Sequence, residues 1–286
     1  MADIQLDYAI PPSDLGDYIS LFYLFTADTP LFEDVERADR AQFRFRLTPG
    51  GHTYRFVDGT AQSPPDAHVI GPTSGPSSVS APGPVRVFGM GLTPLGWAAM
   101  IGRDASTVLN RTLDANLLFG AARMRKATAA LAKAPDLAKC LRIAEPLVRD
   151  LLQRGDGAAC GFVQQVDRWL SGAPSPDIAH LVAETGLSRR QVERKCNMLY
   201  GAPPKLLARK YRALRAAVAM THGDPELDDL LAEGFYDQSH LNREINHFTG
   251  MTPRAFAEAP TELNSQIAKR IALERSSPIS RRGVIT

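Results

Sequence analysis

Two polar stretches in the last third of the chain carry side-chain types that hydrogen-bond to DNA bases and phosphates. The first runs from Ser188 to Tyr200 and the second from Asp237 to Thr249. In each stretch apolar residues recur at i, i+4 and i+7, so a helix would bury one face and expose the other. The exposed side chains would be Arg189, Arg190, Glu193, Arg194 and Asn197 in the first stretch, and Gln238, Ser239, Asn242, Arg243 and Asn246 in the second. Arginine, asparagine, glutamine and serine suit base edges and phosphates, so we interpret both faces as surfaces that read double-stranded DNA.

A single polar helix face is more commonly an ordinary solvated surface, and the interpretation therefore depends on an internal repeat. Residues 181–204 align with residues 230–253 at an offset of 49 residues without a gap. The identical pairs include Arg194 with Arg243, Gly201 with Gly250, and Pro204 with Pro253.

The first copy has the local signals of a helix-turn-helix unit. Ser175 is expected to cap a first helix that begins at Pro176. Ser188 and Gln191 have the spacing of a capping box for a second helix, which should end at Gly201.

The second copy repeats the pattern, with Asp237 as the cap, Gly250 as the stop and a further helix from Pro253. Residues 204–222 between the copies predict a joining helix of about 18 residues, roughly 28 Å long. On this helix Lys205 and Arg209 are expected to contact phosphates.

The distribution of charge supports a nucleic-acid partner, although the net charge of +2 does not. Between Ser188 and Arg215 there are nine basic residues and one acid, Glu193. Between Gly223 and Glu244 there are seven acids and one basic residue, Arg243. We therefore expect the first unit and the joining helix to supply most of the affinity, and the second unit to add discrimination.

The first part of the chain has the alternation of short β-strands. Residues 43–47 and 52–57 both alternate, and the turn between them predicts a hairpin. Further strands are expected at residues 69–70 and 85–88, and residues 15–25 are compatible with a helix.

These signals predict an α+β protein, in which a small β-rich sensor-like domain precedes an all-α double helix-turn-helix domain. The expected regions are a sensor or dimerisation domain (1–115), a helical linker (116–157), the DNA-binding domain (158–260) and a flexible tail (261–286). The least charged run, residues 87–102, is short and broken by glycines, which argues against a membrane span. The acidic start of the chain lacks the pattern of a secretory signal. Three widely spaced cysteines argue against a disulfide framework, so we expect a cytoplasmic protein.

No catalytic constellation, metal site or cofactor site is predicted. His52 and His68 lack the spacing of metal ligands, and we interpret them as ordinary surface or turn histidines. The loop serines Ser74, Ser77 and Ser78 stand outside any Gly-x-Ser-x-Gly elbow. Cys140 and Cys160 are interpreted as buried or inert thiols, and Trp97 and Trp169 as core residues.

Residues 158–259 resemble the DNA-binding region of the AraC/XylS family of bacterial transcription regulators. The likeness is carried by Gly234-Phe235, Asp237-Gln238-Ser239-His240, Arg243 and Gly250-Met-Thr-Pro253. It implies seven helices, with two helix-turn-helix units on a shared helix and recognition helices in adjacent major grooves. The residues implied to read DNA are Arg190, Glu193 and Arg194 in the first unit, and Ser239, Asn242 and Arg243 in the second. The chain departs from the family pattern at Cys196, where a large apolar residue is usual, and at Asn246, where a basic residue is usual.

The sequence thus predicts a sequence-specific DNA-binding transcription regulator, modulated through its N-terminal domain. That domain more weakly resembles the small sensor domains of such regulators, which leaves the effector undefined. A small-molecule effector, a second copy of the chain and, for an activator, RNA polymerase are the expected partners besides DNA. An enzyme with a catalytic β-rich domain and a helical appendage is the alternative, and a protein-interaction module is a third interpretation.

Overall fold

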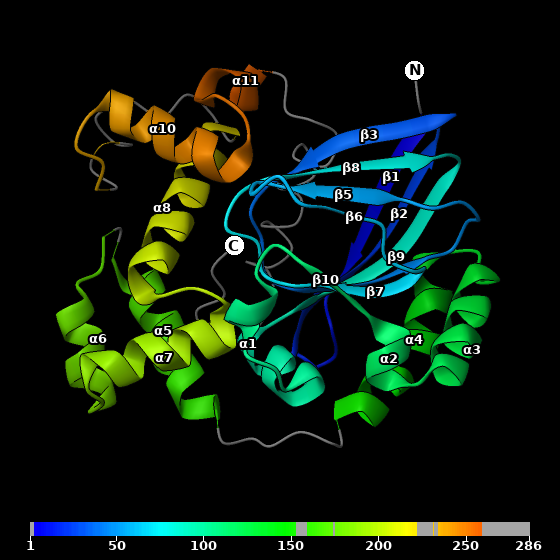
Figure 1. Cartoon of the computed structure of the whole chain (residues 1–286), viewed down its shortest axis with the longest axis horizontal. Coiled ribbons are helices and arrows are strands. Elements are labelled where there is room, and N and C mark those ends of the chain that lie inside the picture. The colour runs from blue at the N-terminus through cyan, green and yellow to red at the C-terminus, as the bar shows by residue number, and fades with distance from the viewer. Residues whose placement is uncertain (1–2, 153–158, 174, 222–230, 232–233, 259–286) are drawn as a thin grey trace.

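Ten strands in the described part of the chain form two antiparallel sheets that pack face to face (Figure 1). The computed structural model describes residues 3–152, 159–173, 175–221, 231 and 234–258. The larger sheet has the order β1-β2-β9-β4-β7-β10, and the smaller has the order β3-β8-β5-β6. The strands are β1 (Asp3–Ala9), β2 (Ile19–Asp28), β3 (Leu31–Glu36), β4 (Gln42–Arg46), β5 (Thr53–Phe56), β6 (Ala61–Gln62), β7 (Ala67–Ile70), β8 (Ser77–Pro82), β9 (Val85–Leu92) and β10 (Thr112–Asp114).

The larger sheet is buried on both of its faces. Along β2, Phe22 and Leu24 belong to a core shared with helices, whereas Tyr23 and Phe25 belong to the core between the two sheets. Successive side chains of a strand point to opposite faces, so one strand contributes to two cores.

Helices cover the outer face of the larger sheet. They are α1 (Pro94–Gly96), the π-helix η1 (Trp97–Ile101), the 3-10 helix η2 (Ala105–Val108), α2 (Ala115–Phe119), α3 (Ala121–Ala132) and α4 (Leu137–Leu152). Trp97 is buried there, as expected. Met124 of α3 and Val148 of α4 share their core with Phe43 and Phe88 of the sheet. The helices expected between the two halves of the chain therefore pack directly on the sandwich.

Two expectations for the β-rich part are wrong. The expected hairpin does not form, because β4 pairs with β7 and β9 in the larger sheet while β5 pairs with β6 and β8 in the smaller one. Residues 15–25 do not form a helix, because residues 19–28 form the long strand β2 between β1 and β9.

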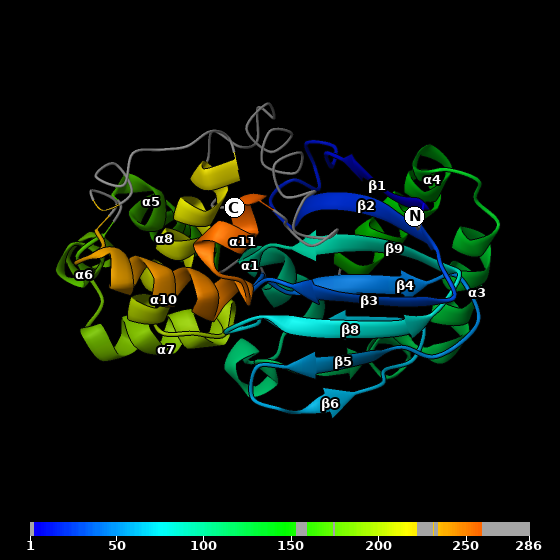
Figure 2. The ribbon, with the colours of Figure 1, turned by 90° about the horizontal axis from the view of Figure 1, so that it is seen from above.

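Six further helices form the rest of the described chain, beside one end of the sandwich (Figure 2). They are α5 (Cys160–Gly172), α6 (Ile178–Thr185), α7 (Arg189–Tyr200), α8 (Pro204–Thr221), α10 (Gln238–Thr249) and α11 (Pro253–Glu258). The joining helix α8 has 18 residues, as expected. Trp169 is a core residue of this part, which was also expected. The cap of α6 is Asp177 rather than Ser175, because the Asp177 side chain accepts from the Ala179 N–H.

The loop between β7 and β8 supports both helical repeats. A Cβ atom added at Gly201, where α7 ends, would lie 3.0 Å from the Pro72 ring, and one at Gly250, where α10 ends, 3.0 Å from Pro76. The carbonyl of Thr73, between those prolines, accepts from Lys210 Nζ on α8 at 3.0 Å. One six-residue loop, residues 71–76, therefore contacts both units and the helix that joins them.

The expected tail at 261–286 and the acidic run at 224–229 lie outside the described residues. Within the described ranges, no helix combines the length and the apolar character that crossing a membrane requires.

Candidate functional site

The first polar face lies on α7, which begins and ends as its sequence indicates. The Ser188 side chain accepts from the Gln191 N–H, the Gln191 side chain accepts from the Ser188 N–H, and Gly201 ends the helix in the left-handed conformation. Val192 and Cys196 are fully buried. The outward residues lie as expected: Arg189, Arg190 and Arg194 are exposed, and Glu193 and Asn197 are half-buried.

Two arginines occupy the first turn of α7, where the helix dipole disfavours positive charge. No acidic residue balances Arg189 and Arg190 in that turn. Arg189 instead pairs with Glu193 at 3.2 Å, one turn further along the helix. The first turn itself, which also holds Arg190, contains no acidic residue. A positive helix start suits a polyanionic partner better than it suits the isolated helix.

The second polar face lies on α10 and repeats the same geometry. The Asp237 side chain accepts from the His240 N–H at 2.6 Å, and Gly250 ends the helix. Leu241, Ile245 and Phe248 are buried. The opposite side is exposed and carries Gln238, Ser239, Asn242, Arg243 and Asn246.

The joining helix α8 divides its basic residues between the surface and the interior. Lys205 is exposed. Arg209 donates to both carboxylate oxygens of Glu244 on α10, at 2.7 and 3.0 Å, and Arg212 lies 3.8 Å from the same carboxylate. Lys210 and Arg212 are buried. The basic block of the sequence is therefore not a single DNA-facing surface, because part of it holds the fold together.

A second candidate site is the cavity between the two sheets, with a volume of about 120 Å³. Its apolar wall includes Phe25, Phe32, Val79 and Val87. Side chains of this kind bind the hydrocarbon part of a small molecule, while a few fixed polar groups orient it.

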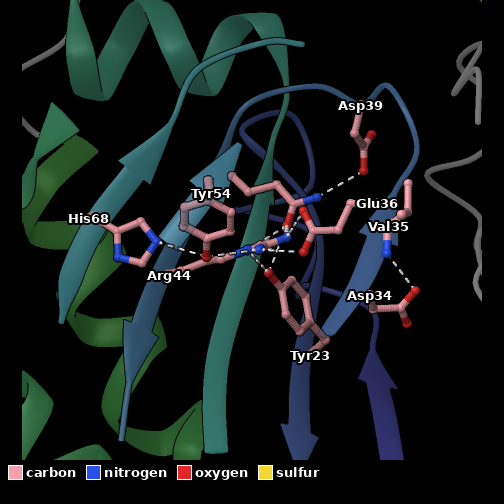
Figure 3. Close-up of polar contacts among 9 residues, drawn as sticks. Tyr23, Asp34, Val35, Glu36, Asp39, Arg44, Tyr54 and His68 are labelled. Atoms are coloured by element: carbon pink, nitrogen blue, oxygen red, sulfur yellow. Dashed lines mark hydrogen bonds and ion pairs between the residues drawn. The ribbon is translucent and has the colours of Figure 1, made fainter. Parts of the chain in front are cut away.

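The polar wall of the cavity is a hydrogen-bonded network centred on Arg44 (Figure 3). Arg44 donates to both oxygens of Glu36, at 2.6 and 3.0 Å, and its Nε donates to the Tyr23 hydroxyl at 2.7 Å. The Tyr23 hydroxyl in turn donates to Gln42 at 2.7 Å. Burial raises the pKa of Tyr23, so this hydroxyl stays protonated at neutral pH. Gly89 makes the arrangement possible, because a Cβ there would lie 2.2 Å from the Tyr23 ring.

Sequence reasoning missed the cavity, although a signal for it is present. In β4, Phe43 and Phe45 face the helices, while Arg44 and Arg46 line the cavity between the sheets. The alternation of apolar and basic residues was interpreted as that of a half-buried strand, yet all four residues are buried. When one face of a strand carries arginines and the other carries aromatic residues, the arginines can face either solvent or a polar cavity inside the protein.

The interpretation of His52 and His68 as surface or turn residues is wrong, since both are buried and their rings lie 4.7 Å apart. His68 contacts the Pro65 carbonyl through Nδ1 at 2.9 Å and the Tyr54 hydroxyl through Nε2 at 3.2 Å. The carbonyl can only accept, so His68 carries its proton on Nδ1. Neither ring nitrogen of His52, which lines the cavity, has a protein partner. Burial, reinforced by the Arg46 and Arg44 guanidinium groups, lowers the pKa of His52 to about 4.

Among the described residues, no three His, Cys, Asp or Glu side chains come together as a metal-binding group. Cys140 is buried, and burial raises the pKa of its thiol; Cys160 is half-buried.

Comparison with protein families identifies the class of the helical part. Residues 181–259 match the model of a helix-turn-helix domain. The part of the chain that carries α7 and α10 is a helix-turn-helix domain of the AraC type, as its sequence implied. The chain therefore carries the DNA-binding domain of a transcription regulator.

Residues 8–114, which span the sandwich except for most of β1, match the model of a domain of unknown function, DUF6597. A comparison with curated proteins gave no match.

A comparison with solved structures gave distant matches to AraC-like regulators. A structure of ToxT from Vibrio cholerae is 8% identical in sequence, with a TM-score of 0.47 over 89% of this chain and 97% of that one. ToxT with a bound unsaturated fatty acid is 9% identical, with a TM-score of 0.46 over 82% and 94%. The AraC-like transcriptional activator CuxR is 14% identical, with a TM-score of 0.33 over 74% and 86%.

Proposed function

We propose that this cytoplasmic regulator reads adjacent major grooves on one face of DNA with α7 and α10. The observation that carries the proposal is the matched geometry of the two helices. Each is capped at its start, buries its apolar side and exposes arginine and amide side chains on the other. An α-helix fits the major groove, where such side chains distinguish base pairs.

The proposed roles differ between residues. Arg190, Glu193, Arg194, Ser239, Asn242 and Arg243 face the bases, while Arg189, Asn197 and Gln238 support them at the groove edges. Lys205 contacts a phosphate. The Arg209 guanidinium already donates two hydrogen bonds to Glu244, so it would contact a phosphate while still bonded to that carboxylate. Lys205 is therefore the better probe of phosphate contact.

The cavity of the sandwich is proposed to bind the effector. The sensing domain would then comprise the two sheets with α2, α3 and α4, and the DNA-binding domain would begin at α5. His52 supports this assignment, because both of its ring nitrogens are buried without a partner at the cavity wall. A buried polar group without a partner is unfavourable, and a ligand or water that satisfies it is favoured. The effector would be a small molecule with an apolar body and a polar group that bonds the His52 imidazole.

Titrations of variants against selected and scrambled DNA at several salt concentrations test the DNA-binding proposal. Arg190→Ala should weaken binding to the selected sequence by about 1–3 kcal/mol, because a base contact is lost. The same change should stabilise the free protein by roughly 0.3–1 kcal/mol, because it removes a positive charge from the start of α7.

Lys205→Ala should weaken binding to both DNAs similarly and reduce the salt slope by about one.

Arg125→Ala is the matched control, since Arg125 is an exposed arginine on α3 outside both polar faces. It should leave both DNA affinities unchanged. Loss of selectivity in Arg125→Ala, or its retention in Arg190→Ala, would contradict the proposed reading face.

A further inference from the structure

Lys210 belongs to the basic block of the sequence, yet it does not face the same way as Lys205. It is only 5% exposed, and its ammonium group donates to the carbonyls of Asp39 at 2.7 Å and Thr73 at 3.0 Å. Both carbonyls belong to the sandwich, whereas Lys210 lies in the middle of α8. A buried ammonium group needs acceptors, so this contact ties α8 to two loops of the sandwich.

Asp39 connects this contact to the cavity wall. Its carboxylate accepts from Gln42 Nε2 at 2.8 Å, and Gln42 Oε1 accepts from Arg44 at 2.8 Å and from Tyr23 at 2.7 Å. Asp39, Gln42, Arg44 and Tyr23 all line the cavity. Figure 3 shows Asp39 beside the network around Arg44. A group that enters the cavity therefore meets Asp39 itself, whose carbonyl accepts from Lys210.

The other neighbours of Lys210 on α8 are bonded to the second recognition helix. Arg209 and Arg212 flank Lys210 and both pair with Glu244 of α10, whose side chain is 7% exposed. A displacement of α8 at Lys210 must therefore move Glu244 or break a largely buried ion pair, which is unfavourable.

The segment between β3 and β4 also packs directly on the helices. The Ala38 N–H donates to the Phe248 carbonyl of α10 at 2.7 Å, and Arg40 Nε donates to the Tyr211 hydroxyl of α8 at 3.0 Å. Residues 36–42 thus line the cavity on one side and contact α8 and α10 on the other.

We propose that Lys210 is a positioning residue that transmits the state of the cavity wall, through Asp39 and Gln42, to the joining helix and α10. This inference rests on the proposed function, because it names how the cavity regulates DNA binding. Lys210 acts on DNA affinity through the orientation of the helices and makes no contact with a phosphate.

A double-mutant cycle in the full-length protein tests the proposal, with binding to DNA selected by the wild type as the measurement. Gln42→Leu removes the link between Asp39 and Arg44, and Lys210→Met removes the ammonium group while keeping the length of the side chain. The two effects on affinity should be non-additive by about threefold or more, as for residues in one hydrogen-bond network. Gln42→Leu paired with Lys205→Met is the matched control on the same helix and should be additive.

The salt dependence gives a second readout, which separates positioning by Lys210 from direct contact with a phosphate. Lys205→Met should reduce the salt slope by about one, whereas Lys210→Met should leave it unchanged. Additive effects of Gln42→Leu and Lys210→Met, or a reduced slope in Lys210→Met, would overturn the proposal. If Lys210→Met does not fold, Gln42→Leu alone decides, because an unchanged DNA affinity in that variant also overturns it. Absence of selective DNA binding by the wild type would instead refute the proposed function.

Discussion

At the scale of single residues, His52 is the group whose surroundings differ most from those expected of a surface histidine. It is buried beside two guanidinium groups and has no hydrogen-bond partner. Its pKa of about 4 lies below the ordinary value near 6.5, so the folded protein keeps the imidazole neutral where the unfolded chain begins to bind a proton.

This difference predicts a pH dependence of stability. Between pH 6.5 and 4 the unfolded state binds more protons at this site than the folded state does, so stability falls as the pH falls through that window and is fully present above it. His68 is shifted in the same direction. His52→Gln should therefore lose less stability than the wild type between pH 7 and pH 5, as measured by urea unfolding at both values. Equal losses in the two proteins would show that the His52 ring is solvated.

At the scale of elements, the helical repeat and several strands could be read from the sequence, but the pairing of those strands into two sheets could not. The capping box of α7, the Asp237 cap and both glycine stops are local signals, and the structure confirms all of them. The pairing of β4 and β5 depends on residues far along the chain, such as those of β8 and β9, and alternation alone does not report which sheet a strand joins. The cavity was missed for the same reason, because His52, Arg44 and Tyr23 are brought together only by the pairing of strands.

The glycines that end the helices allow the contact between α7 and the sandwich to be tested. Gly186 and Gly201 both have positive φ, but only Gly201 lies against the sandwich. Gly186→Ala should cost about 1–2 kcal/mol through backbone strain alone. Gly201→Ala should cost more, because its Cβ would also meet the Pro72 ring at 3.0 Å. Gly161→Ala, in the first turn of α5 with nothing within 4 Å, should cost no stability, because neither backbone strain nor a steric clash opposes it. Unfolding in denaturant measures all three, and equal losses for Gly186→Ala and Gly201→Ala would argue against the contact with Pro72.

At the scale of the whole molecule, a small apolar cluster holds the helices against the sandwich. Ala38 is fully buried and packs with Leu214 of α8 and Phe248 of α10. Ala38→Arg should separate the two parts without unfolding either, because a guanidinium group does not fit a closed apolar contact. Small-angle X-ray scattering should show a larger radius of gyration while circular dichroism stays unchanged. Ala61→Arg, at an exposed position of β6, is the control and should leave the radius as it is.

The loop at residues 71–76 limits how this chain could exchange its parts by recombination. A crossover between Leu152 and Ala159 would bring in foreign helices but leave Pro72 and Pro76 behind. The incoming helices would seat without displacing these prolines if each ended in glycine at the position of Gly201 or Gly250. The two segments that must match each other are therefore far apart in the gene. One encodes the loop at residues 71–76, and the other encodes the helices from α5 to α11. A chimera that transferred both pieces would keep these contacts whatever residues end the incoming helices.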